Sequence, residues 1–230
     1  MTRKFKVTCL TVISIIILCM FLTAQSANAT ATIRLSDGST YFDVADGDGN
    51  DSNGAAGVVT YVGGFNGIWT INVTTGITSG TSSYPILDLN SINVSSTGSG
   101  TLNLFLSDVG YGATPTATFI TEIGGVTDGT VLAKSYLDSG NNLFGTTGTA
   151  TLLGTLGPDV AAFSGTTSTV LDPTDQYSLT NQVTLTHNAA GDTSSFNMKV
   201  SVVPEPISST LFIIGGATLG FRRFRKNRKV

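Results

Sequence analysis

The feature that most constrains the fold is an alternation of apolar and polar residues, with a period of two, that recurs through residues 30–203. Successive side chains of a β-strand point to opposite faces of a sheet, so this alternation predicts strands with one buried face. Gly, Asn and Asp residues separate the alternating runs, as expected for turns. Because a parallel α/β fold needs crossover helices and none is indicated, the segment is predicted to be all-β and antiparallel.

The alternating runs predict about eleven short strands at a spacing typical of an antiparallel β-sandwich, of which a jelly roll is one form. The runs are 32–36, 41–44, 58–62, 68–73, 84–95, 101–106, 116–123, 130–137, 177–187 and 196–202, with weaker apolar islands at 152–153 and 160–163. Hairpin turns are expected around Gly63-Gly64, within 124–129 and within 188–192. The apolar positions shift by one within 84–95, which predicts a bulge near Asn90-Ser91. The predicted core comprises Ile33, Leu35, Val59, Trp69, Ile71, Leu87, Leu89, Leu102, Leu104, Leu185 and Val200.

The end of the chain has three parts in a fixed order. Pro204, Glu205 and Pro206 predict an extended, accessible segment, because each proline fixes φ and lacks a backbone donor. Residues 207–221 form an apolar run that is helical in lipid, and about 22 Å of helix is a marginal span unless the bilayer thins. A basic end then favours the cytoplasmic side. It consists of Arg222, Arg223, Arg225, Lys226, Arg228 and Lys229.

This ordered combination in residues 203–230 resembles the PEP-CTERM sorting signal of Gram-negative bacteria. The resemblance implies transport to the outer face of the inner membrane, followed by recognition and cleavage by an exosortase, a membrane protease-transpeptidase. The catalytic residues would belong to that enzyme. The alternative is a plain tail anchor with a basic stop, although such an anchor has no need of Pro-Glu-Pro.

The other end of the chain predicts a secretory signal peptide over residues 1–29. Three basic residues within 1–6 precede an apolar run over 7–22, and Ala27 and Ala29 provide the small residues of a signal peptidase site. Both cysteines of the sequence lie inside this segment. The exported domain, residues 30–202, is therefore expected to hold no disulfide and no thiolate metal site.

Charge is distributed very unevenly along the chain. Residues 30–206 contain all 15 Asp and Glu but only three of the 12 Lys and Arg, which is a formal charge of −12 that the overall −3 conceals. Such a domain repels nucleic acid and anionic lipid and attracts cations. Nucleic acid is therefore excluded as an expected partner.

The densest polar segment, residues 43–54, suggests a cation site. Asp46, Asp48 and Asn50 keep the spacing of a loop that wraps Ca²⁺ with oxygen ligands. Asp51, however, stands where such a loop needs its turn glycine, and Gly57 stands where it needs a bidentate glutamate. A solvated, turn-rich loop between two strands is the favoured alternative.

Catalytic machinery is not expected. His187 is the one histidine, and it is expected on the surface at a strand end, while no Gly-x-Ser-x-Gly motif is present. Glu122 is the one glutamate before Glu205, and no pair of carboxylates stands out from the turn aspartates. A hydrolase is therefore the least favoured function.

Aromatic residues give an ambiguous indication of sugar binding. Trp69 alternates with apolar residues and is expected in the core, not on a sugar-stacking surface. Tyr61, Phe65, Tyr84 and Tyr111 lie near predicted loops and could line a carbohydrate site, but nothing in the sequence groups them.

The sequence therefore favours an exported protein without catalytic activity or a required cofactor. Its predicted partners are signal peptidase, the general secretion machinery and an exosortase, and exopolysaccharide is a candidate partner. The predicted location is the inner membrane as a precursor, then the cell surface or extracellular matrix. The alternative is a module that binds carbohydrate or calcium on the same sandwich.

Overall fold

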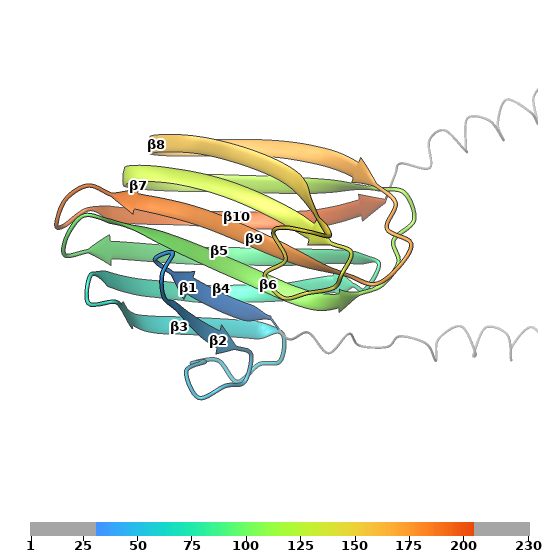
Figure 1. The fold of residues 1–230 in the computed structure, drawn as a ribbon, viewed down its shortest axis with the longest axis horizontal. Helices are drawn as coiled ribbons and strands as arrows, with labels where there is room; N and C mark the ends of the chain where they lie inside the picture. Colours follow the sequence, from blue (N-terminus) through green and yellow to red (C-terminus); the bar gives the residue numbers. More distant parts are fainter. Residues whose placement is uncertain (1–30, 205–230) are drawn as a thin grey trace, which may run out of the picture.

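The computed structural model describes residues 31–204, and their regular elements are β-strands (Figure 1). The ten strands are β1 (Thr32–Ser36), β2 (Tyr41–Ala45), β3 (Val58–Phe65), β4 (Trp69–Thr81), β5 (Tyr84–Ser96), β6 (Gly100–Tyr111), β7 (Ala117–Asp138), β8 (Ala150–Leu171), β9 (Tyr177–His187) and β10 (Thr193–Pro204). The all-β, antiparallel prediction is confirmed. Within 31–204 no helix is long and apolar enough to cross a membrane. The predicted signal peptide, the apolar run 207–221 and the basic end lie outside the described residues.

The strands form two layers that share β7. The hydrogen-bonded order is β2-β1-β6-β9-β7-β10-β5-β4-β3, with β8 also paired to β7, and all pairs are antiparallel. The second half of β7, Thr130–Asp138, pairs with β9, whereas its first half, Ala117–Thr127, pairs with β10. We call the sheet with β2, β1, β6 and β9 the first layer, and the sheet with β3, β4, β5 and β10 the second layer. The two layers run along the long axis of the molecule (Figure 1).

The core lies between these layers. All eleven residues predicted to form it are buried, so that prediction is confirmed. Along much of the two layers, buried residues alternate with exposed or half-buried ones, as in the first part of β6, where Leu102, Leu104 and Leu106 point inward. Burying apolar surface at about 25 cal/mol per Å² is the main stabilising contribution of such an arrangement.

The hairpin expected between residues 116–123 and 130–137 is wrong, because β7 is one continuous strand of 22 residues. The glycines that suggested a turn instead let neighbouring backbone approach closely as β7 passes from one layer to the other. A Cβ on Gly125 would overlap the carbonyl oxygen of Ser195, and a Cβ on Gly129 would overlap that of Thr186. Glycine is thus required at these two positions because the packing leaves no room for a side chain, and not because the chain turns there.

Strand β8 is longer than the apolar islands at 152–153 and 160–163 predicted. It pairs with β7 from Ala150 to Leu171, and most of its side chains are exposed or half-buried. Because few of its side chains enter the core, the apolar alternation that marks the other strands is missing here.

Two smaller features concern turns and bulges. The β3–β4 hairpin forms, but its turn lies at Asn66-Gly67, with φ of 50° and 66°, and not at Gly63-Gly64, which belong to β3. Positive φ at both central residues is characteristic of a type I′ turn, here closed by the Ile68 N–H, which donates to the Phe65 carbonyl at 3.4 Å. The bulge predicted near Asn90-Ser91 is confirmed, because Asn197 of β10 alone opposes these two residues and Ser91 has a φ of 54°.

Candidate functional site

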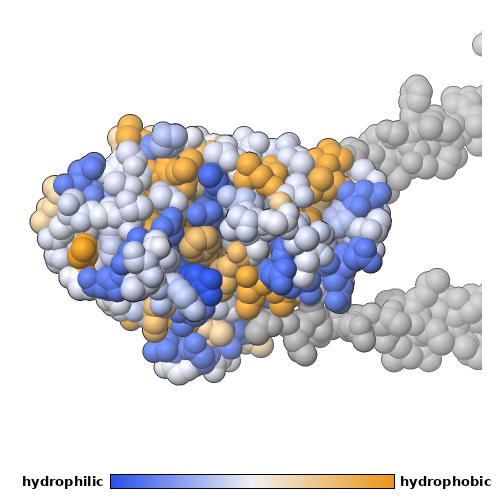
Figure 2. Space-filling view, in the orientation of Figure 1, coloured by the Kyte–Doolittle hydropathy of each residue, from blue (hydrophilic) through white to orange (hydrophobic). Residues whose placement is uncertain are grey.

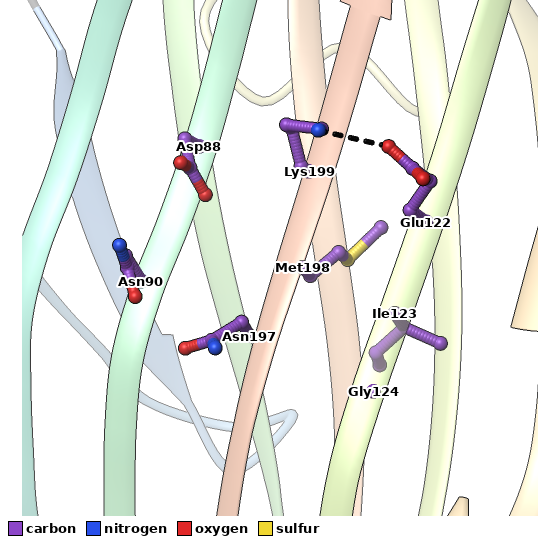
Figure 3. A pocket seen from close by; sticks show the side chains of 8 residues that line it. All are labelled: Asp88, Asn90, Glu122, Ile123, Gly124, Asn197, Met198 and Lys199. Atoms are coloured by element: carbon purple, nitrogen blue, oxygen red, sulfur yellow. Dashed lines mark ion pairs between the residues drawn. The ribbon is translucent and has the colours of Figure 1, made fainter. Parts of the chain in front are cut away.

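A shallow, open hollow of about 460 Å³ lies on the outer face of the second layer (Figure 3). Three neighbouring strands supply its lining, which is Asp88 and Asn90 from β5, Asn197, Met198 and Lys199 from β10, and Glu122, Ile123 and Gly124 from β7. Met198 and Ile123 are buried, whereas the polar members are half-buried or exposed. By strand alternation Met198 and Ile123 face the core, so the hollow presents charged and amide groups above the backbone of the sheet.

Strand register places the charged side chains in one row. Lys199 lies directly opposite Asp88 on one side and opposite Glu122 on the other. Its Nζ lies 2.9 Å from Oε2 of Glu122, an ion pair that Figure 3 marks with a dashed line. Both side chains of the pair are about 40% exposed, so the pair contributes only about 0–1 kcal/mol to stability. The fold thus depends little on this ion pair, and both side chains are accessible to a ligand.

The bulge in β5 orients the amide group in the next row. Asn197 Oδ1 accepts a hydrogen bond from the backbone N–H of Ser91 at 2.6 Å, which fixes the amide plane. The amide N–H donors are not used by that bond. Bulges commonly redirect side chains in this way.

Gly124 keeps the hollow open on the β7 side. It lies opposite Asn197 and has no side chain to project over the outer face. A Cβ added there would meet nothing closer than 3.6 Å, so the backbone does not demand glycine at this position. The backbone conformation does not require glycine here. The effect of Gly124 is instead to leave space above the sheet.

The electrostatics of the hollow favour a polar ligand that both donates and accepts hydrogen bonds. Burial raises the pKa of the Asp88 carboxyl, and the Lys199 ammonium opposes that rise. Carboxylates supply acceptors, the ammonium supplies donors and the amides supply both. Because each sugar hydroxyl donates and accepts, a carbohydrate can match this mixed set.

The aromatic residues expected near a sugar site do not line the hollow. Tyr61, Phe65 and Tyr111 are buried in the core, while Tyr84 is half-buried and packs against it. Trp69 is also buried, as predicted. Of the hollow's residues, only Glu122 was considered from the sequence as a functional side chain, because the pairing of β10 with both β5 and β7 was not evident from spacing.

In the acidic segment 43–54, carboxylates accept hydrogen bonds from nearby backbone N–H groups and so fix the conformation of the loop. Asp48 accepts hydrogen bonds from the N–H groups of Ala45, Asn50 and Asp51, and Asp46 accepts one from Gly57. Within the described residues no group of three or more His, Cys, Asp or Glu side chains is placed to hold a metal ion. Calcium binding by Asp46, Asp48 and Asn50 stays a prediction of the sequence.

The prediction of a surface His187 is wrong. The side chain is about 1% exposed and packs against Trp69, with ring centroids 5.1 Å apart. Its Nδ1 lies 2.8 Å from Oγ of Ser96, and its Nε2 lies 2.9 Å from Oγ of Ser194. Strand alternation explains the burial, because His187 continues the inward series of Val183 and Leu185 in β9.

This buried histidine predicts a loss of stability in mild acid. Burial lowers the pKa of His187, and the carboxylates of Asp192 and Asp128 oppose that shift. In the unfolded chain the pKa is about 6.5, so the unfolded state takes up the proton first as pH falls. The melting temperature should therefore drop between pH 7.5 and 5.5, and the His187→Gln variant should show a smaller drop. Equal drops in both proteins would contradict this role.

On the first layer, the contacts between the loop 139–149 and the sheet were not predicted from the sequence. The loop 139–149 crosses over β6 and β9 (Figure 1), where Phe144 N–H donates to Ser107 Oγ at 3.0 Å. The Arg34 guanidinium lies 4.0 Å from the Phe144 ring centroid and 4.3 Å from that of Tyr41. Arg34 also makes two hydrogen bonds of 2.7 Å to Asp43. Because its charge is paired and both faces are packed, Arg34 joins β2 and the loop to the sheet.

The space-filling view shows the outer surface of the molecule (Figure 2). Hydrophobic and hydrophilic residues are interspersed over the face that this view shows.

Comparisons with known proteins give remote likenesses only. No model of a known protein family matches the chain, and no curated protein matches it. The K1 cleaved adhesin domain of Lys-gingipain from Porphyromonas gingivalis is 13% identical, with 80% of this chain and 95% of that chain covered and a TM-score of 0.32. TmCBM61, solved with β-1,4-galactotriose, is 10% identical, with 62% and 92% covered and a TM-score of 0.29.

The enzymatically active domain of tailspike protein 4 from bacteriophage CBA120 is also similar. It is 15% identical, with 62% of this chain covered and a TM-score of 0.33. The match covers 21% of that chain, so this protein spans about a fifth of its length. At such identities and TM-scores none of these likenesses indicates a function, and the hollow itself must supply the grounds for one.

Proposed function

We propose that this protein is an exported binding module that takes a carbohydrate in the hollow of the second layer. The observation that carries the proposal is the convergence of five hydrogen-bonding side chains from three adjacent strands on one shallow hollow. They are Asp88, Asn90, Glu122, Asn197 and Lys199. The open shape suits a segment of a longer chain that passes across the sheet, and the mixed donors and acceptors suit sugar hydroxyls.

Export and sorting belong to the same proposal and rest on the sequence. Residues 1–29 support secretion, and residues 203–230 support recognition by an exosortase at the inner membrane. A carbohydrate-binding module delivered in this way would reach the cell surface or extracellular matrix, where exopolysaccharide is available as a ligand. No catalytic step is assigned to the protein.

Removing polar groups from the hollow should weaken binding. After a glycan array identifies a ligand, Asp88→Ala combined with Asn197→Ala should reduce its affinity at least about tenfold, since hydrogen bonds to charged groups contribute about 1.5–3 kcal/mol. Isothermal titration calorimetry of the full chain measures the change. Thr101→Ala, on the outer face of the first layer, is the matched control and should bind like wild type.

Three outcomes would overturn the proposal. If wild type and the double variant bound the ligand with equal affinity, the binding site would lie outside the hollow. If incubation with the glycan released shorter sugars, and Glu122→Gln abolished this release, the protein would be a hydrolase and not only a binding module. Absence of any array ligand would leave the hollow without the proposed function.

A further inference from the structure

Strand β8 presents a long edge without a strand partner among residues 31–204. It pairs with β7 on one side only. The β3 edge of the second layer differs, because the segment 46–57 covers it. There Ser52 N–H donates to Thr60 O at 2.9 Å, and Thr60 N–H donates to Asp51 Oδ1 at 2.9 Å. One end of the second layer is therefore protected by its own loop, while the β8 end is not.

Beyond the irregularity at Ala161, which has a φ of 54°, the second half of β8 lacks the features that usually keep an edge strand from pairing. Natural edges carry charged residues, prolines or bulges that block a further strand. Residues 160–171 contain no charged residue and no proline, and the segment is rich in small and β-branched residues. Pro158 and Asp159 lie just before it, and Asp172 follows it. The regular part of this edge, residues 162–171, thus remains suited to backbone pairing.

Exposed apolar side chains follow the same edge. Val160 is 61% exposed and Val170 is 54% exposed, both on β8. Val126 of β7, which is 53% exposed, lies next to Ala162 in the register of the two strands. Leaving such side chains in water forgoes their burial, so a partner that covers them would be favoured.

We propose that this edge pairs with the same edge of a second copy, antiparallel and across a two-fold axis at Thr166. Residues opposite each other in a sheet point to the same face, so Ser164 would face Ser168, and Ala162 would face Val170. Val170 of the second copy would then lie near Val126, and exposed apolar surface would be buried on both sides. The two second layers would form one continuous sheet.

This edge lacks the negative charge that opposes association elsewhere on the domain. The domain is strongly acidic, so two copies repel each other over most of their surface. In the Thr166 register Asp172 lies opposite Val160, and Asp159 lies opposite Pro173, so no two acidic residues oppose each other. A strand that is self-complementary and uncharged satisfies the symmetry of a two-fold interface.

Cross-linking tests the register directly. In the full chain with Cys9 and Cys19 changed to serine, purified in detergent, Thr166→Cys should form a covalent dimer on mild oxidation. Opposed Cα atoms in an antiparallel pair are about 4.5 or 5.5 Å apart, within the range of about 4.4–6.8 Å that a disulfide spans. Thr155→Cys is the matched control on the same strand and should stay monomeric, because the axis at Thr166 does not bring its copies together.

A charge variant tests the dimer without relying on a disulfide. Thr166 is exposed, so Thr166→Lys should fold normally while it places two ammonium groups together at the axis. Sedimentation velocity should show a dimer for wild type and a monomer for Thr166→Lys. A monomeric wild type without the Thr166 cross-link would overturn the proposal, as would equal cross-linking at Thr155. A dimer unaffected by Thr166→Lys would place the interface elsewhere.

Discussion

Replacement of Pro204, Glu205 and Pro206 by alanines is expected to leave export intact and to abolish processing of the C-terminus. The rigid triplet is the part of the predicted sorting signal that a plain membrane anchor does not need. Pro204 is exposed at the end of β10, so its replacement should not disturb the core. The full-length chain should therefore accumulate in the inner membrane with its basic end inside.

Mass spectrometry of membrane and extracellular fractions, in a host that supplies an exosortase, measures this effect. The wild-type chain should be found without its basic end, and the variant should retain all of it. Ser208, Ser209 and Thr210 changed together to alanine give a control of equal size beside the motif, which should be processed. Normal trimming of the Pro-Glu-Pro variant would show that the sorting assignment is wrong.

Gly129→Ala should destabilise the domain strongly, although it adds only one methyl group. Its Cβ would overlap the backbone carbonyl of Thr186, which cannot move without shifting β9. Forcing extra atoms into such a contact costs about 1–3 kcal/mol or more. Gly124→Ala adds the same methyl group to the same strand but meets nothing closer than 3.6 Å, so its stability should stay near that of wild type.

Thermal or urea unfolding of the two variants measures the difference. If β7 were two strands joined by a turn, both glycines would be in loops and both substitutions would have similar, small effects. Similar melting temperatures for Gly124→Ala and Gly129→Ala would therefore contradict a continuous β7. Gly124→Ala should at the same time weaken ligand binding, since it narrows the hollow.

Sequence patterns succeeded where burial follows strand alternation. The outward and inward series in strands such as β1 and β6 predicted the correct core, and the shift within 84–95 predicted the bulge at Ser91. They failed where glycine had a different role. Gly125 and Gly129 suggested a turn, whereas close backbone contacts across β7 require them.

The hollow was not predictable because it depends on which distant strands lie side by side. Asp88, Glu122 and Lys199 are separated by many residues in sequence and meet only because β10 lies between β5 and β7. His187 was misplaced for a related reason. Its place at a strand end suggested the surface, but Ser96 and Ser194, which partner its ring nitrogens, come from other strands.

The strand order has a consequence for when this domain can fold. β9 lies between β6 and β7, and β10 lies between β5 and β7. In both layers, β7 therefore cannot join the earlier strands until the last two strands are present. A chain emerging from its N-terminus cannot complete either sheet before residues 177–204 arrive. Folding must therefore wait for almost the whole domain, and a chain that stays unfolded meanwhile could pass through the secretion channel that the predicted signal peptide implies. Because β10 ends at Pro204, completion of the fold coincides with arrival of the predicted cleavage motif.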